Sequence, residues 1–412
     1  MKTNKHQIVI IGGGAGGLSV ASQLRKHRPE LDIAIVEPSE HHYYQPAWTL
    51  VGGGAYVIEK TRRAQVRYIP RHAKWIRQQA VAFEPEQNTV VLADGSRLQY
   101  EHLVVAAGIQ LNWHEITGLQ ETLGKNGVTS NYSYACAPYT WECLRNHKEG
   151  RALFTQPPMP IKCPGAPQKI LYLAADYFRK QGLNMDVRFY TAGASMFGVA
   201  PYAKALAKVA SEYGLKTEFG HNLVAVDGPG KIATFEVGAE RQRLEVEFDM
   251  IHVVPPQSAP DFIKQSPLAN ADGWVAVNRS NMRHERYGNI HAIGDCTSAP
   301  HSKTAAAVRQ IAPVVSANLL ADITGEEALA SYDGYASCPV TTSRDKVMLC
   351  EFAYDGAITP SFSGDPRKPR HSYWLLKRYY LPWLYWRMIA GHLGPDQHAQ
   401  RELSDKLPLI SP

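Results

Sequence analysis

Short runs of consecutive apolar, mostly β-branched residues alternate with helical patterns in the first part of the chain. Residues 7–11 (QIVII) are typical of a strand that is buried on both faces of a parallel sheet. A glycine-rich turn follows, then a helical pattern over 18–27 and a second apolar strand over 32–36. This order predicts a strand–helix–strand unit of an α/β fold.

The turn inside this unit has the spacing of a dinucleotide-binding loop. Gly12, Gly14 and Gly17 fit G-x-G-x-x-G, with Ala15 inside the motif. Such glycines permit a tight turn and a close approach of the backbone to a pyrophosphate, and the helix N-terminus adds N–H donors. Glu37 ends the second strand about 20 residues further on, where an acceptor for ribose hydroxyls belongs. We therefore expect this unit to bind a dinucleotide.

The composition narrows the class of protein. A chain of 412 residues allows two or three domains, and 44% hydrophobic with 20% charged residues is ordinary for a soluble globular protein. The net charge of +6 is a weak hint of an anionic partner. Six cysteines are too few for a disulfide framework at this length. We expect no transmembrane helix and no signal peptide, because no long apolar run or h-region occurs.

A cysteine stands where a second dinucleotide loop would lie. Residues 151–155 have a strand pattern, but QPPMPIKCPG (156–165) follows without a glycine fingerprint, and prolines lack the N–H groups of a phosphate cradle. Cys163 follows Lys162 and precedes a helix expected from Pro167, and both features lower a thiol pKa. Cys338 also precedes a proline in a turn-rich stretch. We expect both cysteines on exposed loops, as a redox-active pair.

The other four cysteines are interpreted mainly as structural. Cys143 lies in a helical stretch and Cys350 in a strand-like run, both typical of core positions. Cys296 follows a Gly-Asp pair and is expected to be a tightly packed small residue, with a redox role left open. Cys136 bears on the family resemblance described below.

The segment 366–395 combines basic and aromatic residues and has no acidic residue. Helical spacing places five apolar or aromatic residues near one face, and Pro382 is expected to split the segment into two short helices. This combination is typical of a helix lying in a membrane interface. A lid on another domain or a homo-oligomer contact is the alternative, and the fold disfavours nucleic-acid binding. The face consists of Tyr373, Leu376, Tyr380, Trp383 and Leu384, and the basic residues are Arg367, Lys368, Arg370, Lys377, Arg378 and Arg387.

Several longer motifs resemble the sulfide:quinone oxidoreductases, in the branch that includes the mitochondrial enzymes and their bacterial relatives, within the flavoprotein disulfide reductase-like superfamily. The similarity spans nearly the whole chain. Its motifs are YYQPAWTLVG (43–52), KCPGAPQKI (162–170), GDCT (294–297), SKTAAA (302–307) and YDGYASCP (332–339).

The resemblance implies an α/β fold with two Rossmann-like domains and a C-terminal membrane-associating segment. The FAD-binding domain is expected to be split into residues 1–110 and 285–330. A second Rossmann-like domain without a nicotinamide fingerprint would span 111–284 and carry Cys163. The C-terminal region, 331–412, would hold Cys338 and amphipathic anchoring helices.

The resemblance also implies FAD as the cofactor and assigns its contacts. The helix near Lys303 would point its N-terminus at the pyrimidine end of the flavin. Other branches use a third cysteine near Cys136, sometimes bonded to the flavin, but here the position is about one residue off, so we expect Cys136 to be neither essential nor bonded to FAD. We predict no metal site. The expected FAD contacts are Gly12, Gly14, Ala15, Gly17, Glu37, Gln45, Pro46, Ala107, Gly108, Gly294, Asp295, Lys303 and Thr304.

The implied reaction is oxidation of sulfide at the cysteine pair and reduction of a quinone. HS⁻ would attack a Cys163–Cys338 disulfide or sulfur-bridged form. We expect Cys338 to take the sulfur and Cys163 to reduce FAD, with the order left open. Sulfide, sulfite or a thiol would remove the sulfur, and ubiquinone or menaquinone would take the electrons near Phe352 and Tyr354. We expect a peripheral protein of the bacterial inner membrane, with the side and a homo-oligomeric state left open.

Three other interpretations remain open at this point. A type II NADH:quinone oxidoreductase shares the fold and the anchor, but it needs the missing second fingerprint. The flavin subunit of a sulfide dehydrogenase would pass electrons to a cytochrome and has no use for the basic aromatic segment. A non-catalytic flavin-binding redox sensor would respond to oxidants without turning over sulfide.

Overall fold

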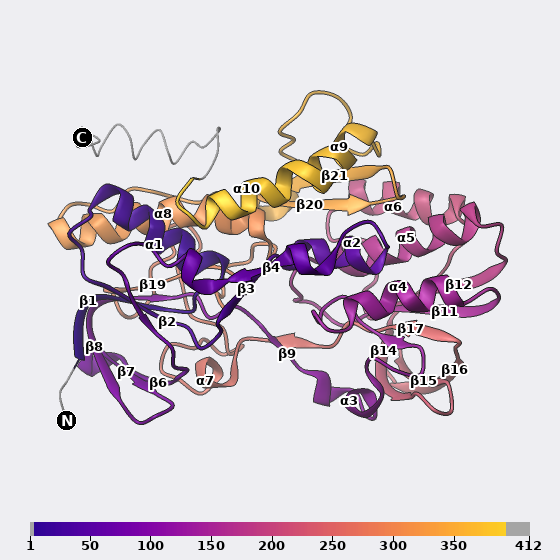
Figure 1. Cartoon of the computed structure of the whole chain (residues 1–412), viewed down its shortest axis with the longest axis horizontal. Helices are drawn as coiled ribbons and strands as arrows, with labels where there is room; N and C mark the ends of the chain where they lie inside the picture. Colours follow the sequence, from indigo (N-terminus) through magenta and orange to yellow (C-terminus); the bar gives the residue numbers. More distant parts are fainter. Residues whose placement is uncertain (1–3, 393–412) are drawn as a thin grey trace.

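The computed structural model describes residues 4–392 and contains two sheets built largely of parallel strands, each flanked by helices (Figure 1). The first sheet has the order β5-β2-β1-β8-β7-β6, with β19 beside β8. Its central strands β2, β1, β8 and β19 are parallel. The strands are β1 (Asn4–Ile11), β2 (Ile33–Val36), β5 (Lys74–Ile76), β6 (Ala80–Glu84), β7 (Thr89–Leu92), β8 (Arg97–Val105) and β19 (Ile290–Ala292).

Two helices cover the first sheet and direct their N-termini toward the same cavity. α1 (Ala15–His27) follows β1 directly, and α8 (Ala305–Thr324) follows β19 after a short loop. The helices pack against each other beside the sheet (Figure 1). Thr304 caps α8, since its Oγ1 accepts a hydrogen bond from the N–H of Ala307 at 3.2 Å. Chain segments far apart in sequence thus build one dinucleotide-binding unit.

The hydrophobic core of this first unit extends beyond the expected domain boundary. Ile263, Leu268, Val275 and Met282 belong to the same buried cluster as the residues of β1. The segment from residue 259 to 284 therefore packs with the first sheet, although the sequence division placed it in the second domain. The sequence of this segment does not indicate which of the two sheets it packs against.

The second sheet repeats the strand–loop–helix arrangement. Its order is β10-β17-β11-β12-β13, with parallel neighbours throughout. A three-stranded antiparallel sheet, β14-β15-β16, lies beside it (Figure 1). The bounds are β10 (Val128–Thr129), α4 (Ala137–Asn146), β11 (Gly150–Gln156), α5 (Ala166–Lys180), β12 (Met185–Thr191), α6 (Ala200–Glu212), β13 (Lys216–Phe219), β14 (His221–Asp227), β15 (Ile232–Val237), β16 (Gln242–Glu247) and β17 (Met250–His252).

Smaller elements connect and flank the two sheets. The pairs β3–β4 and β9–β18 are two-stranded and antiparallel. The bounds are β3 (His41–Tyr43), α2 (Trp48–Gly52), β4 (Arg62–Ala64), β9 (Gln110–Leu111), α3 (Leu119–Thr122), β18 (Gln257–Ser258) and α7 (Asp261–Lys264).

A hairpin of β20 (Ala336–Thr341) and β21 (Val347–Phe352) carries Cys338. Because side chains alternate across a strand, its two faces differ. Cys338 lies opposite Cys350 on one face, which belongs to the core around α5. Ser337 lies opposite Glu351 on the other face. The hairpin therefore separates the cysteine side from the side that faces the C-terminal helix.

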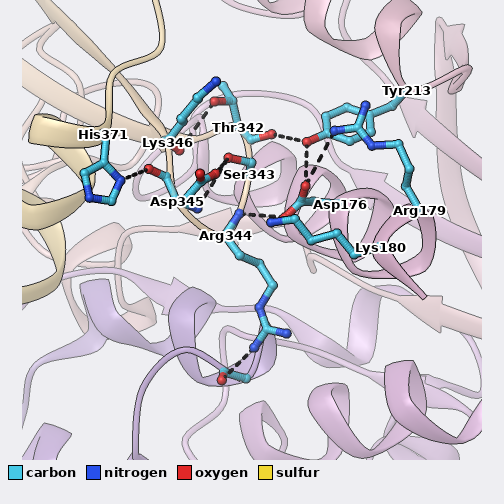
Figure 2. Close-up of polar contacts among 11 residues, drawn as sticks. Asp176, Arg179, Lys180, Tyr213, Thr342, Ser343, Arg344, Asp345, Lys346 and His371 are labelled. Atoms are coloured by element: carbon cyan, nitrogen blue, oxygen red, sulfur yellow. Dashed lines mark hydrogen bonds and ion pairs between the residues drawn. The ribbon is translucent and has the colours of Figure 1, made fainter. Parts of the chain in front are cut away.

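The turn of this hairpin is held against α5 by a buried carboxylate (Figure 2). Asp176 is 1% exposed and accepts hydrogen bonds from the backbone N–H of Arg344 at 2.9 Å and from the Tyr213 hydroxyl at 3.2 Å. Lys180 forms an ion pair with the same side chain at 2.8 Å. Arg344 continues to the carbonyl of Gly54 at 2.9 Å. Since α5 also follows the Cys163 loop, these contacts fix the hairpin relative to that loop.

The C-terminal helix is one continuous run, not the two separate helices that were expected from Pro382. α9 (His371–Leu375) passes through a π-helical turn (Leu376–Tyr380) into α10 (Leu381–Met388), with right-handed helical dihedrals at both junctions. Pro382 sits in the first turn of α10, where the wider preceding turn tolerates its missing N–H. The run lies along one edge of the molecule, over both sheets (Figure 1).

The exposed face of this helix also differs from the expected one. Of the expected face, Tyr380 and Trp383 are 39% and 52% exposed, whereas Tyr373 and Leu384 are buried. Leu375 and Tyr379, which lie outside that face, are 46% and 63% exposed. The helical period was correct, but a period alone does not say which side packs inward. No helix within residues 4–392 combines the length and apolar character needed to cross a bilayer. The end of the expected C-terminal region, 393–412, lies outside the described residues.

Candidate active site

A cavity of about 2030 Å³ is lined by both sheets' loops, the hairpin and the C-terminal helix. Pockets for drug-sized ligands usually measure about 300–1,000 Å³, so this one has room for a dinucleotide and a second molecule. Gly17 and Cys338 lie behind its wall. The predicted residues that line it are Gly12, Gly14, Ala15, Glu37, Gln45, Pro46, Ala107, Gly108, Cys163, Gly294, Asp295, Lys303 and Thr304.

The glycine loop is shaped by close backbone approach. Gly12 has φ +102°, and a Cβ there would lie 2.4 Å from the carbonyl oxygen of Ala106. A Cβ on Gly17 would lie 1.9 Å from the carbonyl of Gly12. At Gly14, in contrast, no heavy atom lies within 4 Å of a Cβ position, and the residue lines the cavity. The loop thus leaves open space where a phosphate would meet the N-terminus of α1.

Glu37 faces the cavity beside this loop. Its carboxylate accepts hydrogen bonds from the backbone N–H of Gly13 at 2.8 Å and of Ser39 at 2.7 Å. These bonds fix the side chain and leave further lone pairs for ribose hydroxyls. The carboxylate therefore stands where the sequence spacing predicted an acceptor.

Two residues that support the glycine loop were missed in the sequence. Gln65 donates from Nε2 to the carbonyl of Gly13 at 2.8 Å. His42 lies 3.2 Å from the same carbonyl through Nδ1 and 2.8 Å from the Tyr385 hydroxyl through Nε2. Burial lowers the pKa of His42 to about 4, so its ring is neutral. These contacts tie the loop to α10, and residues so distant in sequence give no local signal.

The second FAD element, around α8, is held by Lys303. Its Nζ donates to the carbonyls of Asp295 at 2.6 Å and Thr297 at 3.2 Å and lies 3.9 Å from the centroid of the Trp274 ring. The ammonium is thus committed to protein groups, and burial lowers its pKa. Burial likewise raises the pKa of the Asp295 carboxyl, which faces the cavity.

These features fit FAD. The open space at Gly14 suits a pyrophosphate, Glu37 suits an adenosine ribose, and the N-terminus of α8 offers a partial positive charge to an electron-rich ring. Within residues 4–392 no group of three or more His, Cys, Asp or Glu side chains could hold a metal ion.

The two predicted redox cysteines meet at the cavity, with Sγ atoms 3.6 Å apart. Cys163 lies in the loop before α5, and its N–H donates to the carbonyl of Lys303 at 2.8 Å, which joins this loop to the FAD element. A Cβ on Gly165 would lie 2.6 Å from the Sγ of Cys338. Only glycine at residue 165 therefore allows the close approach of the two sulfurs.

Cys338 is fully buried in strand β20, so the expectation of an exposed loop was wrong for this residue. The following proline had suggested a turn. In a two-stranded hairpin each strand has a free edge, and a proline there costs no ladder hydrogen bond. Cys163, by contrast, does lie in a loop, with φ +50°.

The electrostatics make the two sulfurs unequal. The Lys169 ammonium lies 2.8 Å from the Cys163 Sγ and favours Cys163 as the thiolate, which makes Cys338 the donor in a contact whose geometry allows either sulfur to donate. The Cys338 contact and the Lys169 ammonium together hold the pKa of Cys163 well below its usual range, despite burial. Its contact with the Cys163 sulfur, together with burial, raises the pKa of Cys338 well above the usual range. Cys163 is thus the thiolate of the pair, and Cys338 the thiol.

Two further lysines surround the pair. Lys377 was counted among the surface charges of the C-terminal segment, but it is buried, and its Nζ donates to the carbonyl of Pro339 at 2.7 Å. Burial, and then the nearby Lys169, lower its pKa well below the usual range. Lys162 donates to Gln45, and burial lowers its pKa to about 8. Of the three amines, Lys169 lies directly on the Cys163 sulfur, and the two cysteines raise its pKa despite burial, so its positive charge favours a small anion next to the sulfurs.

The other cysteines do not take part in this arrangement. Cys143 and Cys296 are buried, and burial raises the pKa of each to about 11. Burial also raises the pKa of Cys350, behind Cys338. Cys136 stands at the start of α4 and does not line the cavity.

One arm of the cavity runs between the hairpin and the C-terminal helix. Its walls include Leu349 and Glu351 from β21, Leu384 from α10, and Phe362 and Tyr380. Phe362 and Tyr380 are also 47% and 39% exposed. The arm is therefore largely apolar and opens at the surface beside the exposed aromatic residues of the helix.

The two predicted quinone-pocket residues do not line this arm. Phe352 packs against Phe197, with ring centroids 5.7 Å apart. Tyr354 donates its hydroxyl to the carbonyl of Arg279 at 2.7 Å. Strand alternation turns Glu351, not Phe352, toward the cavity, and a role of Phe352 and Tyr354 at the quinone stays a prediction.

Known proteins resemble this chain over most of its length. Residues 6–136 match the pyridine nucleotide-disulphide oxidoreductase family. A mitochondrial sulfide:quinone oxidoreductase of Dictyostelium discoideum is 46% identical over 94% of this chain and 87% of its own length. The mitochondrial sulfide:quinone oxidoreductase of Mus musculus is 39% identical over 95% and 88%. The structure of the sulfide:quinone oxidoreductase of Aquifex aeolicus superimposes with a TM-score of 0.79 at 19% identity, covering 100% of this chain and 96% of that one.

Proposed function

The chain belongs to the sulfide:quinone oxidoreductase family, and from this premise we propose that Cys163 and Cys338 oxidise sulfide and that a quinone is reduced in the apolar arm. FAD is the cofactor, and when held by Gly14, Glu37 and the N-terminus of α8 it would supply two-electron chemistry between the cysteine pair and the quinone. The observation that carries the proposal is the 3.6 Å contact between two unequal sulfurs, with the Lys169 ammonium on one of them.

The inequality of the sulfurs supports an order for the sulfur step. HS⁻ attacks the Cys338 sulfur of a Cys163–Cys338 disulfide, so that a new S–S bond forms and the old one breaks. Cys338 becomes a persulfide, and Cys163 leaves as a thiolate. A thiol of low pKa is the better leaving group, and Lys169 holds the charge that develops on it. The sulfide sulfur loses two electrons, and the disulfide gains them.

Removal of the sulfur completes the cycle at the cysteines. A nucleophile attacks the outer sulfur of the persulfide and frees the Cys338 thiolate. The disulfide forms again when the pair gives up its two electrons. Sulfide, sulfite and a thiolate all qualify as the nucleophile, and the Lys169 ammonium favours an anionic one.

The position of the apolar arm supports a lipid-dissolved quinone as the acceptor. The arm opens beside Leu375, Tyr379 and Trp383, which are exposed on the C-terminal helix. Arg378 and Arg387 lie on the same helix and suit anionic headgroups. We therefore propose peripheral attachment to a quinone-bearing membrane. The bacterial inner membrane that the sequence suggested is one such membrane, and the names of the two curated relatives point to the mitochondrial one.

An anaerobic two-step mixing experiment tests this function. Sulfide should bleach the flavin absorbance of the intact protein, and a short-chain ubiquinone should restore it. Cys163→Ser and Cys338→Ser should each retain FAD but slow the bleaching by at least about 10³-fold, as removal of a nucleophile does. Cys143→Ser, a buried cysteine outside the cavity, is the matched control. Normal bleaching in both active-site variants contradicts the proposal, and bleaching by NADH instead would favour the type II enzyme.

A further inference from the structure

A buried carboxylate faces the arm that we assign to the quinone. Glu351 is 3% exposed and lines the cavity on the same face of the hairpin as Leu349. A carboxylate beside apolar walls costs free energy unless hydrogen bonds compensate it. The cysteine chemistry described above makes no use of this group.

Hydrogen bonds connect Glu351 to the protein surface. Its Oε1 accepts from the hydroxyls of Tyr335 and Ser361, the latter at 2.6 Å, and its Oε2 accepts from the N–H of Ser361 at 2.9 Å. Ser361 is exposed, and both partners line the cavity. A hydroxyl that touches both solvent and carboxylate offers a proton path that bypasses the apolar arm.

Quinone reduction needs protons on this side of the hairpin. Oxidation of H₂S to the level of elemental sulfur releases two electrons and two protons, and conversion of a quinone to a quinol consumes two of each. Cys338, however, lies on the opposite face of the hairpin from Glu351. Protons freed at the Cys338 sulfur therefore do not arrive directly beside the quinone.

We propose that Glu351 donates one of the two protons to the quinone oxygen and is recharged from solvent through Ser361. This inference rests on the proposed function. The O–H bond of the neutral carboxyl breaks, an O–H bond of the quinol forms, and the electrons are those taken from sulfide. The resulting carboxylate is stabilised by Tyr335 and Ser361 until a proton reaches it through the serine hydroxyl.

The surroundings of Glu351 suit a group that changes its charge during each turnover. Tyr335 on the preceding loop donates to it, and Lys377 and Arg309 line the same cavity from the C-terminal helix and α8. The Tyr202 hydroxyl is bonded to the backbone N–H and C=O of Glu351, not to its carboxylate. Cys350, the preceding residue, faces the opposite side of the strand. The two hydroxyls and the backbone N–H of Ser361 can therefore stabilise the anionic form.

Reoxidation of the reduced enzyme by two acceptors tests the proposal. The full-length, FAD-loaded protein is reduced anaerobically with one equivalent of sulfide and then mixed with decylubiquinone or ferricyanide across a range of pH. Ferricyanide takes up electrons without protons. In Glu351→Gln, reoxidation by the quinone should be about 10²-fold slower, the loss typical for one proton donor. Reoxidation by ferricyanide and the preceding reduction by sulfide should remain within about two-fold of the unmodified protein.

The pH profile and a conservative variant separate proton donation from a structural role. The dependence of quinone reduction on pH in the unmodified protein should vanish in Glu351→Gln, whose amide has no acidic proton to donate. Glu351→Asp should restore part of the rate and the pH dependence. Glu245→Gln, an exposed position on β16, is the control.

Three outcomes would overturn the assignment. Equal slowing with both acceptors, or loss of the sulfide-driven step, would mean that Glu351 only holds the hairpin in place. A weaker apparent affinity for the quinone at an unchanged limiting rate and pH profile would make it only a wall of the pocket. If the unmodified protein is reduced by sulfide but not reoxidised by any quinone, the proposed function itself fails, and the proton donor with it.

Discussion

The two strand–loop–helix units of this protein have the same architecture but opposite chemistry in their loops. Between β1 and α1 a short loop of glycines leaves open space beside Gly14. Between β11 and α5 a longer, proline-containing loop holds Cys163 close to the start of the helix. A helix N-terminus stabilises negative charge in both units. The first unit uses it for a phosphate supplied by a ligand, and the second uses it for a thiolate supplied by the chain.

The difference teaches that a nucleotide-binding scaffold changes function through a single loop. The second sheet keeps its parallel order, and α5 keeps its place beside β11. Only the loop has lost the backbone donors of a phosphate cradle and gained a nucleophile. Lys169, in the first turn of α5, is a cation that could also bind a phosphate, but here its ammonium contacts the Cys163 sulfur.

Gly14→Val should produce the largest effect, on the first loop alone. Its φ of −75° suits any residue, and no protein atom crowds the Cβ position, so folding should be unaffected. The added side chain enters the cavity where the cofactor belongs, and FAD affinity should fall by about 10²-fold, as overpacking of one to three kcal/mol implies. Fluorescence titration of the apoprotein with FAD measures the loss.

Gly288→Val supplies the control, since no heavy atom lies within 4 Å of its Cβ position and its φ is not positive. Undiminished FAD affinity in Gly14→Val would show that the first loop does not bind the cofactor. The contrast between a phosphate-binding loop and a thiolate-bearing loop would then be wrong.

Lys169→Met should act on the second loop. The ammonium lowers the pKa of Cys163, so its removal should raise that pKa by one to two units, roughly the strength of a hydrogen bond to a charged group. The pH profile of Cys163 alkylation by iodoacetamide in the reduced protein should move to higher pH, with a roughly 10- to 100-fold slower reaction at neutral pH. Lys208→Met, an exposed position on α6, should leave the profile unchanged. An unshifted profile would assign the thiolate to another cause.

Gly165→Ala should separate the two sulfurs. The residue has ordinary negative φ, so the added methyl group causes no backbone strain, but it would lie 2.6 Å from the Cys338 Sγ. Formation of the Cys163–Cys338 disulfide should slow by about 10-fold, because a bond of about 2.05 Å needs close approach. Thiol counting during oxidation by glutathione disulfide measures this rate. Gly198→Ala, which has open space around its Cβ position, should oxidise normally.

Asp176→Asn should have the smallest effect on chemistry. It weakens the contacts that hold the hairpin turn on α5 (Figure 2), and the free energy of unfolding should fall by about 2 kcal/mol. Urea denaturation measures the change, with the exposed Asp272→Asn as control. A large loss of sulfide oxidation without loss of stability would show that the turn sets the geometry of the sulfurs more directly than we expect.

The sequence predicted best what local chemistry determines. The glycine loop and Glu37 are recognised from residues close together in the chain, and both line the cavity as expected. The absence of a second glycine fingerprint can likewise be seen from a short stretch of sequence. The pairing of Cys163 with Cys338 was expected from two proline-flanked cysteines in a nucleotide-binding fold, whereas their roles and the FAD contacts beyond the glycine loop and Glu37 came from the resemblance to a family. Nothing near Cys338 in the sequence indicates a strand, and the proline after it pointed to a loop.

The sequence did not predict which side of a helix or strand packs inward. Lys377 looked like a surface charge because its neighbours are basic and aromatic, yet packing turns it toward the sulfurs. Phe352 looked like a pocket wall, although a shift of one residue along the strand exchanges the faces. Such choices are made by contacts between distant segments, and one sequence contains no direct record of them.

The alternation of side chains between the two faces of the β20–β21 hairpin bears on where the sulfur product and the quinol leave the protein. Cys338 and Leu349 lie on opposite faces of this hairpin, so in the proposed reaction sulfur is bound on one face and the quinone is reduced on the other. In the proposed reaction, a polar persulfide product departs toward water and the reduced carrier toward lipid. The hairpin itself would thereby keep a reactive sulfur species away from the bilayer.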